Sequence, residues 1–253
     1  MRARQPDVEG HVQCDGLKIG YEVFGNGAPT LLLVPGWTII HSRCWKLQVP
    51  YLADHFRVIT FDRPGNGRSD RPLEPAAYTV TAVADQALAV MDATGTDRAV
   101  LVSLSRGVLE SLKLAADHPD RVLGAIFISP ALMLEPDHRE RTAAIDRFFD
   151  PYPADPQRWD RLNAQYWLDH YADFAASEVL LADVQAITGP EAALEWAERV
   201  SVPNLVIHGG DDPIGPLSWA RSLARCMSGE LAILEGAGHI PLARDPVRVN
   251  DLI

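Results

Sequence analysis

The chain has 253 residues, of which 47% are hydrophobic and 23% charged, a balance that suits a packed globular protein and excludes wholesale disorder. Its formal net charge of −11 argues against a nucleic-acid binder, which needs a basic face, and against attraction to an anionic membrane surface. No apolar run approaches the roughly 18–20 residues that cross a bilayer, and the start lacks the apolar segment of a secretory signal. With three scattered cysteines and no C-x-x-C spacing, we expect a cytoplasmic protein with free thiols and no metal site.

The first 130 residues alternate between strand-like and helix-like segments. The predicted strands span 17–24, 30–34, 57–61, 99–102 and 122–128. The predicted helices between them span 45–56, 79–93 and 107–116. The alternation resumes near the end, with strands at 204–208 and 231–234, a helix at 217–227 and a short helix from about 246. Short apolar strands separated by helices are typical of a parallel sheet covered on both faces.

The segment 131–200 differs in composition from the rest of the chain. It has few strand-like runs, it holds 9 of the 19 aromatic residues, and its 14 acidic residues outnumber its 6 arginines. We therefore expect a single α/β core made of 1–130 and 201–253, with a helical cap inserted at 131–200. An acidic cap favours neutral substrates over polyanions.

The segment Ser103-Leu104-Ser105-Arg106-Gly107 follows a predicted strand and opens a predicted helix. A sharp strand-to-helix turn that exposes a nucleophile requires small residues two positions before and after it, which here are Ser103 and Gly107. Such a turn raises the Ser105 hydroxyl above the sheet and sets the Arg106 N–H at a helix start, where it can face a developing oxyanion. By itself, however, the segment fits a serine-rich helix N-cap equally well.

Two later loops carry the groups that a serine nucleophile needs. His239 lies in a glycine-flanked segment after the last predicted strand, where its imidazole could act as the base. Asp211 and Asp212 follow the strand at 204–208, and either carboxylate could orient that imidazole. Taken singly, a histidine is more often structural, and aspartate before proline often forms a turn. The joint order of serine, aspartate and histidine, each just after a strand, is what points to catalysis.

This order is the chain order of the α/β-hydrolase triad, and the chain resembles the α/β-hydrolase fold family over nearly its whole length. Two more segments carry the resemblance. Val34-Pro35-Gly36-Trp37 looks like the family's oxyanion loop, and the run F-D-R-P-G-N-G-R-S-D at 61–70 is similar to its D-x-R-G-x-G-x-S-D turn. The resemblance implies a mostly parallel, eight-stranded α/β sheet with helices on both faces and an inserted helical cap. The motif set also resembles actinobacterial hydrolase-like proteins, some of them fused to regulatory domains.

Carried over position by position, the resemblance makes Ser105 the nucleophile and His239 the general base. The family's G-x-x-D pattern falls on 209–212, which makes Asp212 the acid and leaves Asp211 as the alternative. Neither a metal nor an organic cofactor is implied.

The resemblance also assigns the oxyanion hole to the backbone N–H groups of Trp37 and Arg106. The chain departs from the family here, because Pro35 stands where histidine is usual and Arg106 is bulky and charged. Its guanidinium is expected either to pair with a carboxylate behind the turn or to contact an acidic group of the substrate.

Five residues are predicted to line the substrate pocket, because they adjoin the catalytic positions or lie in the oxyanion loop or the aromatic cap. They are Leu104, Ile214, Ile240, His41 and Trp167. For the cap aromatics simple packing is the alternative, and for His41 it is a solvated loop position.

The resemblance implies a hydrolase of carboxylic esters or lactones that works through an acyl-enzyme, with an apolar small molecule as substrate. The same three residues would also serve C–C bond hydrolases and cofactor-free perhydrolases. Haloalkane dehalogenases and epoxide hydrolases are disfavoured, since they use aspartate where this chain has Ser105. A ligand-binding or regulatory module with little turnover is the alternative outside catalysis. A homodimer is left open.

Overall fold

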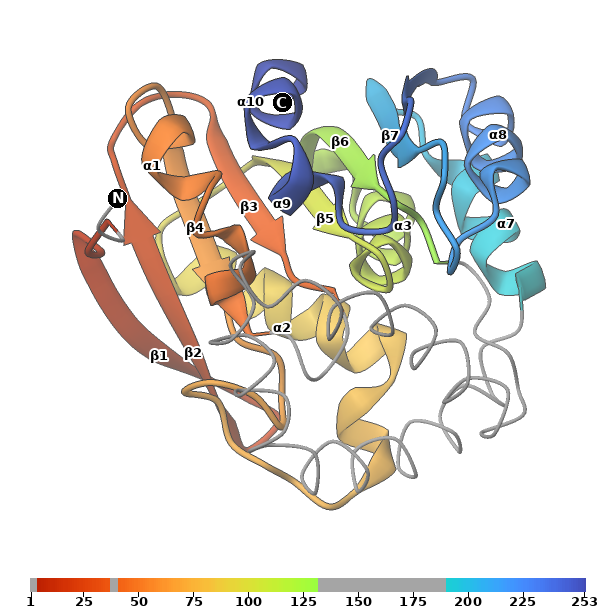
Figure 1. Cartoon of the computed structure of the whole chain (residues 1–253). Helices are drawn as coiled ribbons and strands as arrows, with labels where there is room; N and C mark the ends of the chain where they lie inside the picture. The colour runs from red at the N-terminus through yellow and green to blue at the C-terminus, as the bar shows by residue number, and fades with distance from the viewer. Residues whose placement is uncertain (1–3, 37–40, 132–189) are drawn as a thin grey trace, which may run out of the picture.

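The computed structural model describes residues 4–36, 41–131 and 190–253. Their centre is one sheet of eight strands (Figure 1). The strands are β1 (Val8–Cys14), β2 (Leu17–Phe24), β3 (Thr30–Val34), β4 (Arg57–Phe61), β5 (Ala99–Leu104), β6 (Val122–Ile128), β7 (Asn204–Gly209) and β8 (Glu230–Leu234). Their order is β1-β2-β4-β3-β5-β6-β7-β8, with β1–β2 and β2–β4 antiparallel and every other pair parallel. The mostly parallel, eight-stranded sheet is therefore confirmed.

The direction of the strand order reverses between β3 and β5. The chain passes from β3 to β4 on one side of β3 and later places β5 on its other side. At such a reversal the connections leave in opposite directions, which opens a space outside the carboxyl ends of the strands where ligands usually bind. The loops after Val34 and Leu104 meet at this edge.

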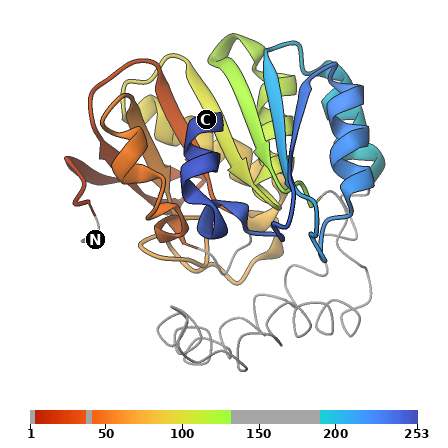
Figure 2. The ribbon, with the colours of Figure 1, turned by 45° about the horizontal axis from the view of Figure 1, so that its top comes forward.

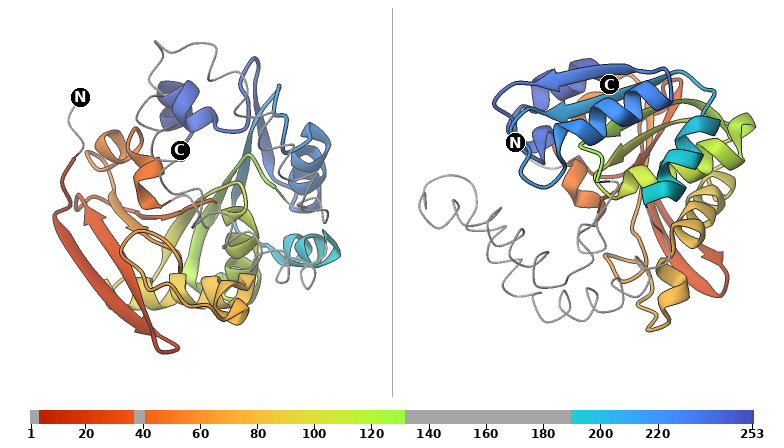
Figure 3. Two further views of the ribbon diagram at one scale, coloured as in Figure 1. Left: turned by 60° about the horizontal axis from the view of Figure 1, so that its bottom comes forward. Right: turned by 90° about the vertical axis from the view of Figure 1, so that its right-hand side faces the viewer.

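Helices cover both faces of the sheet (Figure 3). One face is covered by α2 (Val80–Ala93), α3 (Gly107–Asp117), α7 (Pro190–Arg199) and α8 (Leu217–Cys226). The other is covered by α1 (Val49–Leu52), α9 (Pro241–Arg244) and α10 (Pro246–Leu252). The remaining turns are the 3₁₀ helices η1 (Ser42–Trp45), η2 (Pro75–Tyr78) and η3 (Pro119–Arg121).

The central strands are apolar throughout because both of their faces are buried. Successive side chains of a strand point to opposite faces. In β3, Leu32 and Val34 pack into the cluster under α2 and α3, whereas Leu31 and Leu33 pack into the cluster under α1 and α10. This is the burial pattern that the continuous apolar runs predicted.

The C-terminal helices are tied to α1, far away in the sequence, and Figure 2 shows α1 and α10 on the same face. Gln48 donates its side-chain amide to the carbonyl of Leu242 at 2.8 Å, and Asn250 donates to the carbonyl of Leu47 at 3.1 Å. Both amides are buried, so these contacts satisfy polar groups that would otherwise be costly.

Two local expectations differ from the structure. The edge strand β1 was not predicted, because its side chains are mostly exposed and its sequence has no apolar run. The helix expected over 45–56 is reduced to the end of η1 and the single turn α1. Pro50 explains the late start of α1, since proline lacks the N–H that a continuous helix needs at that position.

Most of the predicted cap lies outside the described residues, at 132–189, and stays a prediction. Its described end forms α7, whose Ala193 and Ala197 pack into the same apolar cluster as α3. Within the described ranges, no helix is both long and apolar enough to cross a membrane.

Candidate active site

Ser105 lies at the sharp turn between β5 and α3. Its backbone is left-handed, with φ of +53°, which is uncommon for a residue with a side chain. The turn is held by its own backbone, because Ser105 donates its N–H to the carbonyl of Ile128 at 2.8 Å and accepts from the N–H of Val108 at 3.1 Å. Strain of this kind persists only where the surroundings fix it, and it is frequent at functional positions.

The small residues predicted around Ser105 are needed for close packing. A Cβ on Gly107 would lie 2.6 Å from the carbonyl oxygen of Pro35 and 2.9 Å from that of Val34, so only glycine lets α3 start against the end of β3. Ser103 is wholly buried and donates its hydroxyl to the carbonyl of Ile126 at 3.3 Å.

Three predicted side chains form a continuous hydrogen-bonded chain beyond the carboxyl ends of the strands. The Oγ atom of Ser105 lies 2.8 Å from Nε2 of His239, and Nδ1 of His239 lies 2.8 Å from Oδ2 of Asp212. A carboxylate only accepts, so His239 carries its proton on Nδ1, and its Nε2 is left to accept the serine proton. Asp212 has a fully buried side chain, His239 is nearly buried, and Ser105 is partly exposed.

Asp212 is held as an anion by donors on both of its oxygens. Oδ1 accepts the backbone N–H groups of Ile214 at 2.8 Å and Gly215 at 2.9 Å. Burial by itself raises the pKa of the Asp212 carboxyl, but the hydrogen bonds from His239, Gly215 and Ile214 outweigh it, so the pKa lies below its ordinary value. The neighbouring Asp211 is exposed and donates its backbone N–H to the carbonyl of Ala237, so Asp212 is the one that reaches His239.

The loops that carry Asp212 and His239 are in close contact. A Cβ on Gly209, the last residue of β7, would lie 2.3 Å from the carbonyl oxygen of Gly238. Gly236 turns the chain after β8 with φ of +76°. The absence of side chains at these positions is what lets a histidine after β8 reach an aspartate after β7.

Of the two predicted oxyanion donors, only Arg106 lies within the described residues; Trp37 lies outside them. The loop that leads to Trp37 packs against the serine turn, since a Cβ on Gly36 would be 3.3 Å from the carbonyl of Leu104 and 3.6 Å from the Cβ of Ser105. Arg106 is the N-cap residue of α3, next to Ser105.

The Arg106 side chain is buried in an ion cluster behind the turn. Its Nε lies 3.5 Å from Oε1 of Glu110, one helical turn later, and its Nη2 donates to the carbonyl of Tyr78 at 3.4 Å. Arg63 pairs with the same glutamate oxygen. Arg63, Arg106 and Glu110 are each at most 2% exposed. Of the two expectations for the guanidinium, pairing with a carboxylate is confirmed.

Asp62 connects the 61–70 turn to the residues that follow the oxyanion loop. Its Oδ1 accepts the N–H of Ser42 at 2.8 Å, and its Oδ2 accepts the N–H of Arg68 at 3.0 Å. Sequence reasoning matched this turn to a motif of the family but gave no role to Asp62, Arg63 or Glu110. The four-residue spacing of Arg106 and Glu110 on a helix is the signal that could have found Glu110.

The predicted pocket residues have different surroundings. Ile214 and Ile240 flank the two loops and are half-buried. Leu104 is 1% exposed and packs in the apolar cluster under α1. His41 caps η1, with its Nδ1 accepting the N–H of Arg43 at 3.0 Å. Trp167 lies outside the described residues. Pocket lining therefore stays a prediction for all five.

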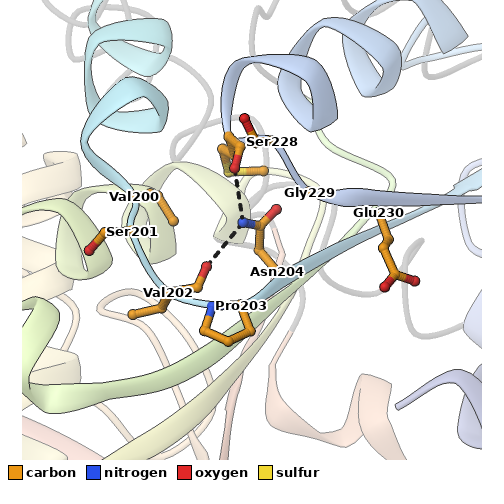
Figure 4. Close-up of a pocket in the computed structure, with 9 residues that line it drawn as sticks. Val200, Ser201, Val202, Pro203, Asn204, Ser228, Gly229 and Glu230 are labelled. Carbon is orange, nitrogen blue, oxygen red and sulfur yellow. Dashed lines mark hydrogen bonds between the residues drawn. The ribbon is translucent and has the colours of Figure 1, made fainter.

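A separate groove of about 560 Å³ lies at the amino ends of β7 and β8. Figure 4 shows the residues that line it. These include Asn204 and Glu230, the first residues of β7 and β8, whereas Ser105, Asp212 and His239 follow the carboxyl ends of their strands. The groove is therefore not part of the site described above. Among the described residues, no group of histidine, cysteine and acidic side chains is arranged to hold a metal ion.

Comparison with known proteins shows the family to which the chain belongs. The family model described as alpha/beta hydrolase fold matches residues 29–182. The chain is 30% identical over 233 residues to "Putative carbamate hydrolase RutD" of Caulobacter segnis, which covers 82% of this chain and 83% of that one. It is 27% identical to "AB hydrolase superfamily protein YisY" of Bacillus subtilis, over 92% of each chain.

Solved structures give the same fold. Est816, described as an N-acyl homoserine lactone degrading enzyme, superposes with a TM-score of 0.77 at 25% identity, over 96% of this chain and 98% of that one. A bacterial membrane phospholipase A superposes with a TM-score of 0.83 at 23% identity, over 97% and 84%.

The ion cluster behind the turn leads to a stability prediction. We expect Glu110→Gln to lower the free energy of unfolding by about 3–5 kcal/mol, because it leaves two buried guanidinium groups facing a neutral amide. Urea unfolding at neutral pH measures this. The matched control is Asp92→Asn, which removes the exposed partner of Arg121 and should cost no more than about 1 kcal/mol. Equal, small losses in both variants would contradict the role given to Glu110.

Proposed function

We propose that this chain, which belongs to the α/β-hydrolase fold family, is a serine hydrolase that cleaves carboxylic esters or lactones through an acyl-enzyme. The observation that carries the proposal is the hydrogen-bonded chain from Ser105 through His239 to the buried carboxylate of Asp212. A hydroxyl, an imidazole and an anion in this order form the group that turns a weak serine nucleophile into an effective one.

In the first half of the reaction, Ser105 Oγ attacks the substrate carbonyl carbon while His239 Nε2 takes the hydroxyl proton. The carbonyl oxygen becomes an oxyanion, and the imidazolium is stabilised by Asp212, which stays ionised. The tetrahedral intermediate then collapses. The bond to the leaving oxygen breaks, and His239 returns the proton to that oxygen.

In the second half, His239 takes a proton from water, whose oxygen attacks the acyl carbon of the Ser105 ester. Collapse of the second intermediate releases the carboxylic acid and returns the proton to Ser105. The balance is one ester and one water giving one acid and one alcohol, or one hydroxy acid from a lactone. No redox step or cofactor is required.

The oxyanion would be held by the backbone N–H groups of Arg106 and Trp37. The position of Arg106 supports its part, because its side chain is anchored to Glu110 and Tyr78 and its backbone begins α3. Donors at a helix start that are fixed before reaction need no reorganisation, and each is worth on the order of 10²–10³ in kcat in related chemistry.

Two observations support the substrate class. Est816, which is similar in structure, is described as a lactone-degrading enzyme. The negative net charge of the chain favours a neutral small molecule over a polyanion as substrate. A cytoplasmic location and a homodimer stay predictions from the sequence. C–C bond hydrolysis and perhydrolysis would use the same three residues.

Carbamate hydrolysis is a second candidate, supported by the similarity to a protein named as a carbamate hydrolase. A panel of p-nitrophenyl esters, lactones and an aryl carbamate, each assayed by kcat/KM, separates the two. We expect the esters or lactones to be the better substrates. A carbamate with the highest kcat/KM would transfer the proposal to that class.

Replacement of the nucleophile gives the first test of catalysis. We expect Ser105→Ala to reduce p-nitrophenyl acetate hydrolysis by on the order of 10⁴-fold or more, since the attacking atom is removed. Wild type should be labelled by a fluorophosphonate and the variant should not. A folded wild type with neither turnover nor label would refute the serine-hydrolase proposal and leave a binding or regulatory role.

The choice of acid is tested by a pair of neighbouring variants. Asp212→Asn should lower kcat by on the order of 10⁴-fold, because the amide can donate to Nδ1 and so favours the wrong tautomer of His239. Asp211→Asn is the matched control and should stay within a few-fold of wild type, since this side chain is exposed. Steady-state kinetics at neutral pH measure both. A larger loss in the Asp211 variant would reverse the assignment.

A further inference from the structure

A second histidine lies against the carboxylate of Asp212. His208 is the last-but-one residue of β7 and is fully buried. Its Nε2 lies 2.9 Å from the carbonyl oxygen of Gly215 and 3.7 Å from Oδ2 of Asp212. That oxygen is the one bonded to Nδ1 of His239. The mechanism described above gives His208 no role.

The hydrogen bond to Gly215 fixes the tautomer of His208. A carbonyl oxygen only accepts, so the proton must be on Nε2. Nδ1 has no hydrogen-bond partner within the described parts of the chain, so a second proton there would be a buried donor without an acceptor. Burial lowers the pKa of His208, and the charge of Asp212 and the bond to Gly215 oppose this only in part. The imidazole is therefore neutral at physiological pH.

The carbonyl that His208 holds belongs to the loop that holds Asp212. Gly215 donates its own N–H to Oδ1 of Asp212, and Ile214 does the same. Asp211, Pro213 and Pro216 in this loop are exposed, whereas Gly215 is buried against the segment that follows β6, where a Cβ would lie 2.9 Å from the carbonyl oxygen of Pro130. His208 thus connects the end of β7 to the buried glycine of a loop whose other residues are exposed or half-buried.

We propose that His208 is a positioning residue for the acid of the active site. Its Nε2–H donates a hydrogen bond to the Gly215 carbonyl and so fixes the position of this loop. The fixed loop keeps the N–H groups of Ile214 and Gly215 on Oδ1 of Asp212. The carboxylate is thereby oriented so that Oδ2 contacts His239. The inference rests on the proposed function, because it deepens the role given there to Asp212.

The neutral state of His208 is part of this role. Among the described residues, the titratable groups that act on it are Asp212 and His239. The neutral imidazole of His208, whose Nε2 lies 3.7 Å from Oδ2 of Asp212, does not neutralise the carboxylate. The negative charge therefore stabilises His239, whose Nδ1 lies 2.8 Å from the same oxygen, whereas an imidazolium at His208 would compete for that charge. Misplacement of a catalytic group by about 1 Å can cost on the order of 100-fold in rate, so a tether of this kind has a measurable effect.

Two variants separate the hydrogen bond from the bulk of the side chain. His208→Leu keeps much of the volume and removes the donor, whereas the amide nitrogen of His208→Gln can occupy the place of Nε2. Ile207→Val, one residue earlier on the same buried strand, is the control for a mild packing change.

For p-nitrophenyl acetate we expect His208→Leu to lower kcat by roughly 10- to 100-fold with KM within about twofold. His208→Gln should regain most of that loss, and Ile207→Val should match wild type. The acid limb of the kcat/KM profile should move to lower pH in His208→Leu, because a displaced carboxylate stabilises the His239 imidazolium less. A role in folding alone would not move this limb.

A readout without substrate separates this inference from the proposed function. The proton shared by His239 and Asp212 should give a far-downfield proton NMR resonance, retained in His208→Gln and lost or shifted in His208→Leu. If wild type fails to hydrolyse any ester, the proposed function fails, and the resonance still tests the positioning. A His208→Leu variant with wild-type resonance, kcat and pH profile would overturn the inference, as would equal losses in the Leu and Gln variants.

Discussion

Gly107 starts α3 directly against the end of β3, where a side chain would collide with the backbone carbonyls of Pro35 and Val34. This close approach sets the geometry of the rest of the site. It forces the preceding residue pair into a sharp turn, with Ser105 in a left-handed conformation, and it brings the loop after β3 beside the serine. Ser105 therefore follows the carboxyl end of β5, where the strand order reverses, and it is partly exposed there.

Three buried carboxylates organise the surroundings of that turn, each in a different way. Glu110 is neutralised by two guanidinium groups and anchors the residue that follows the serine. Asp62 accepts backbone N–H groups from two loops. Asp212 accepts two backbone donors and an imidazole, which leaves it charged and able to stabilise a neighbouring imidazolium. Only the third carboxylate is connected to the serine, so burial of an acid does not by itself identify a catalytic group.

Close packing against the strands holds the two loops that carry Asp212 and His239 in place. Asp212 and His239 both lie on connections, yet glycines at the ends of these connections let them pack closely on the strands. A hydrogen bond from His208 adds a contact between the rigid strand β7 and the loop of Asp212. The sheet therefore positions the site, because the loops that carry Asp212 and His239 pack against the ends of its strands.

The sequence by itself determined the α/β character of the fold and the bounds of most buried strands, because apolar periodicity is a local signal. Ser105 and His239 were identified from the joint order of the motifs and the resemblance to the hydrolase family. Sequence reasoning missed the exposed strand β1 and overestimated the helix near Pro50. The resemblance favoured Asp212 over Asp211, but only the tertiary structure showed which of the two carboxylates contacts His239. It also paired Arg106 with Glu110 and placed His208 beside Asp212. Loops that pack together from different parts of the chain decide which of two adjacent aspartates points inwards. They also decide which partner a buried charge is paired with. Ser105 and His239, for example, are 134 residues apart in the chain and 2.8 Å apart in space, and local patterning carries no record of such a contact.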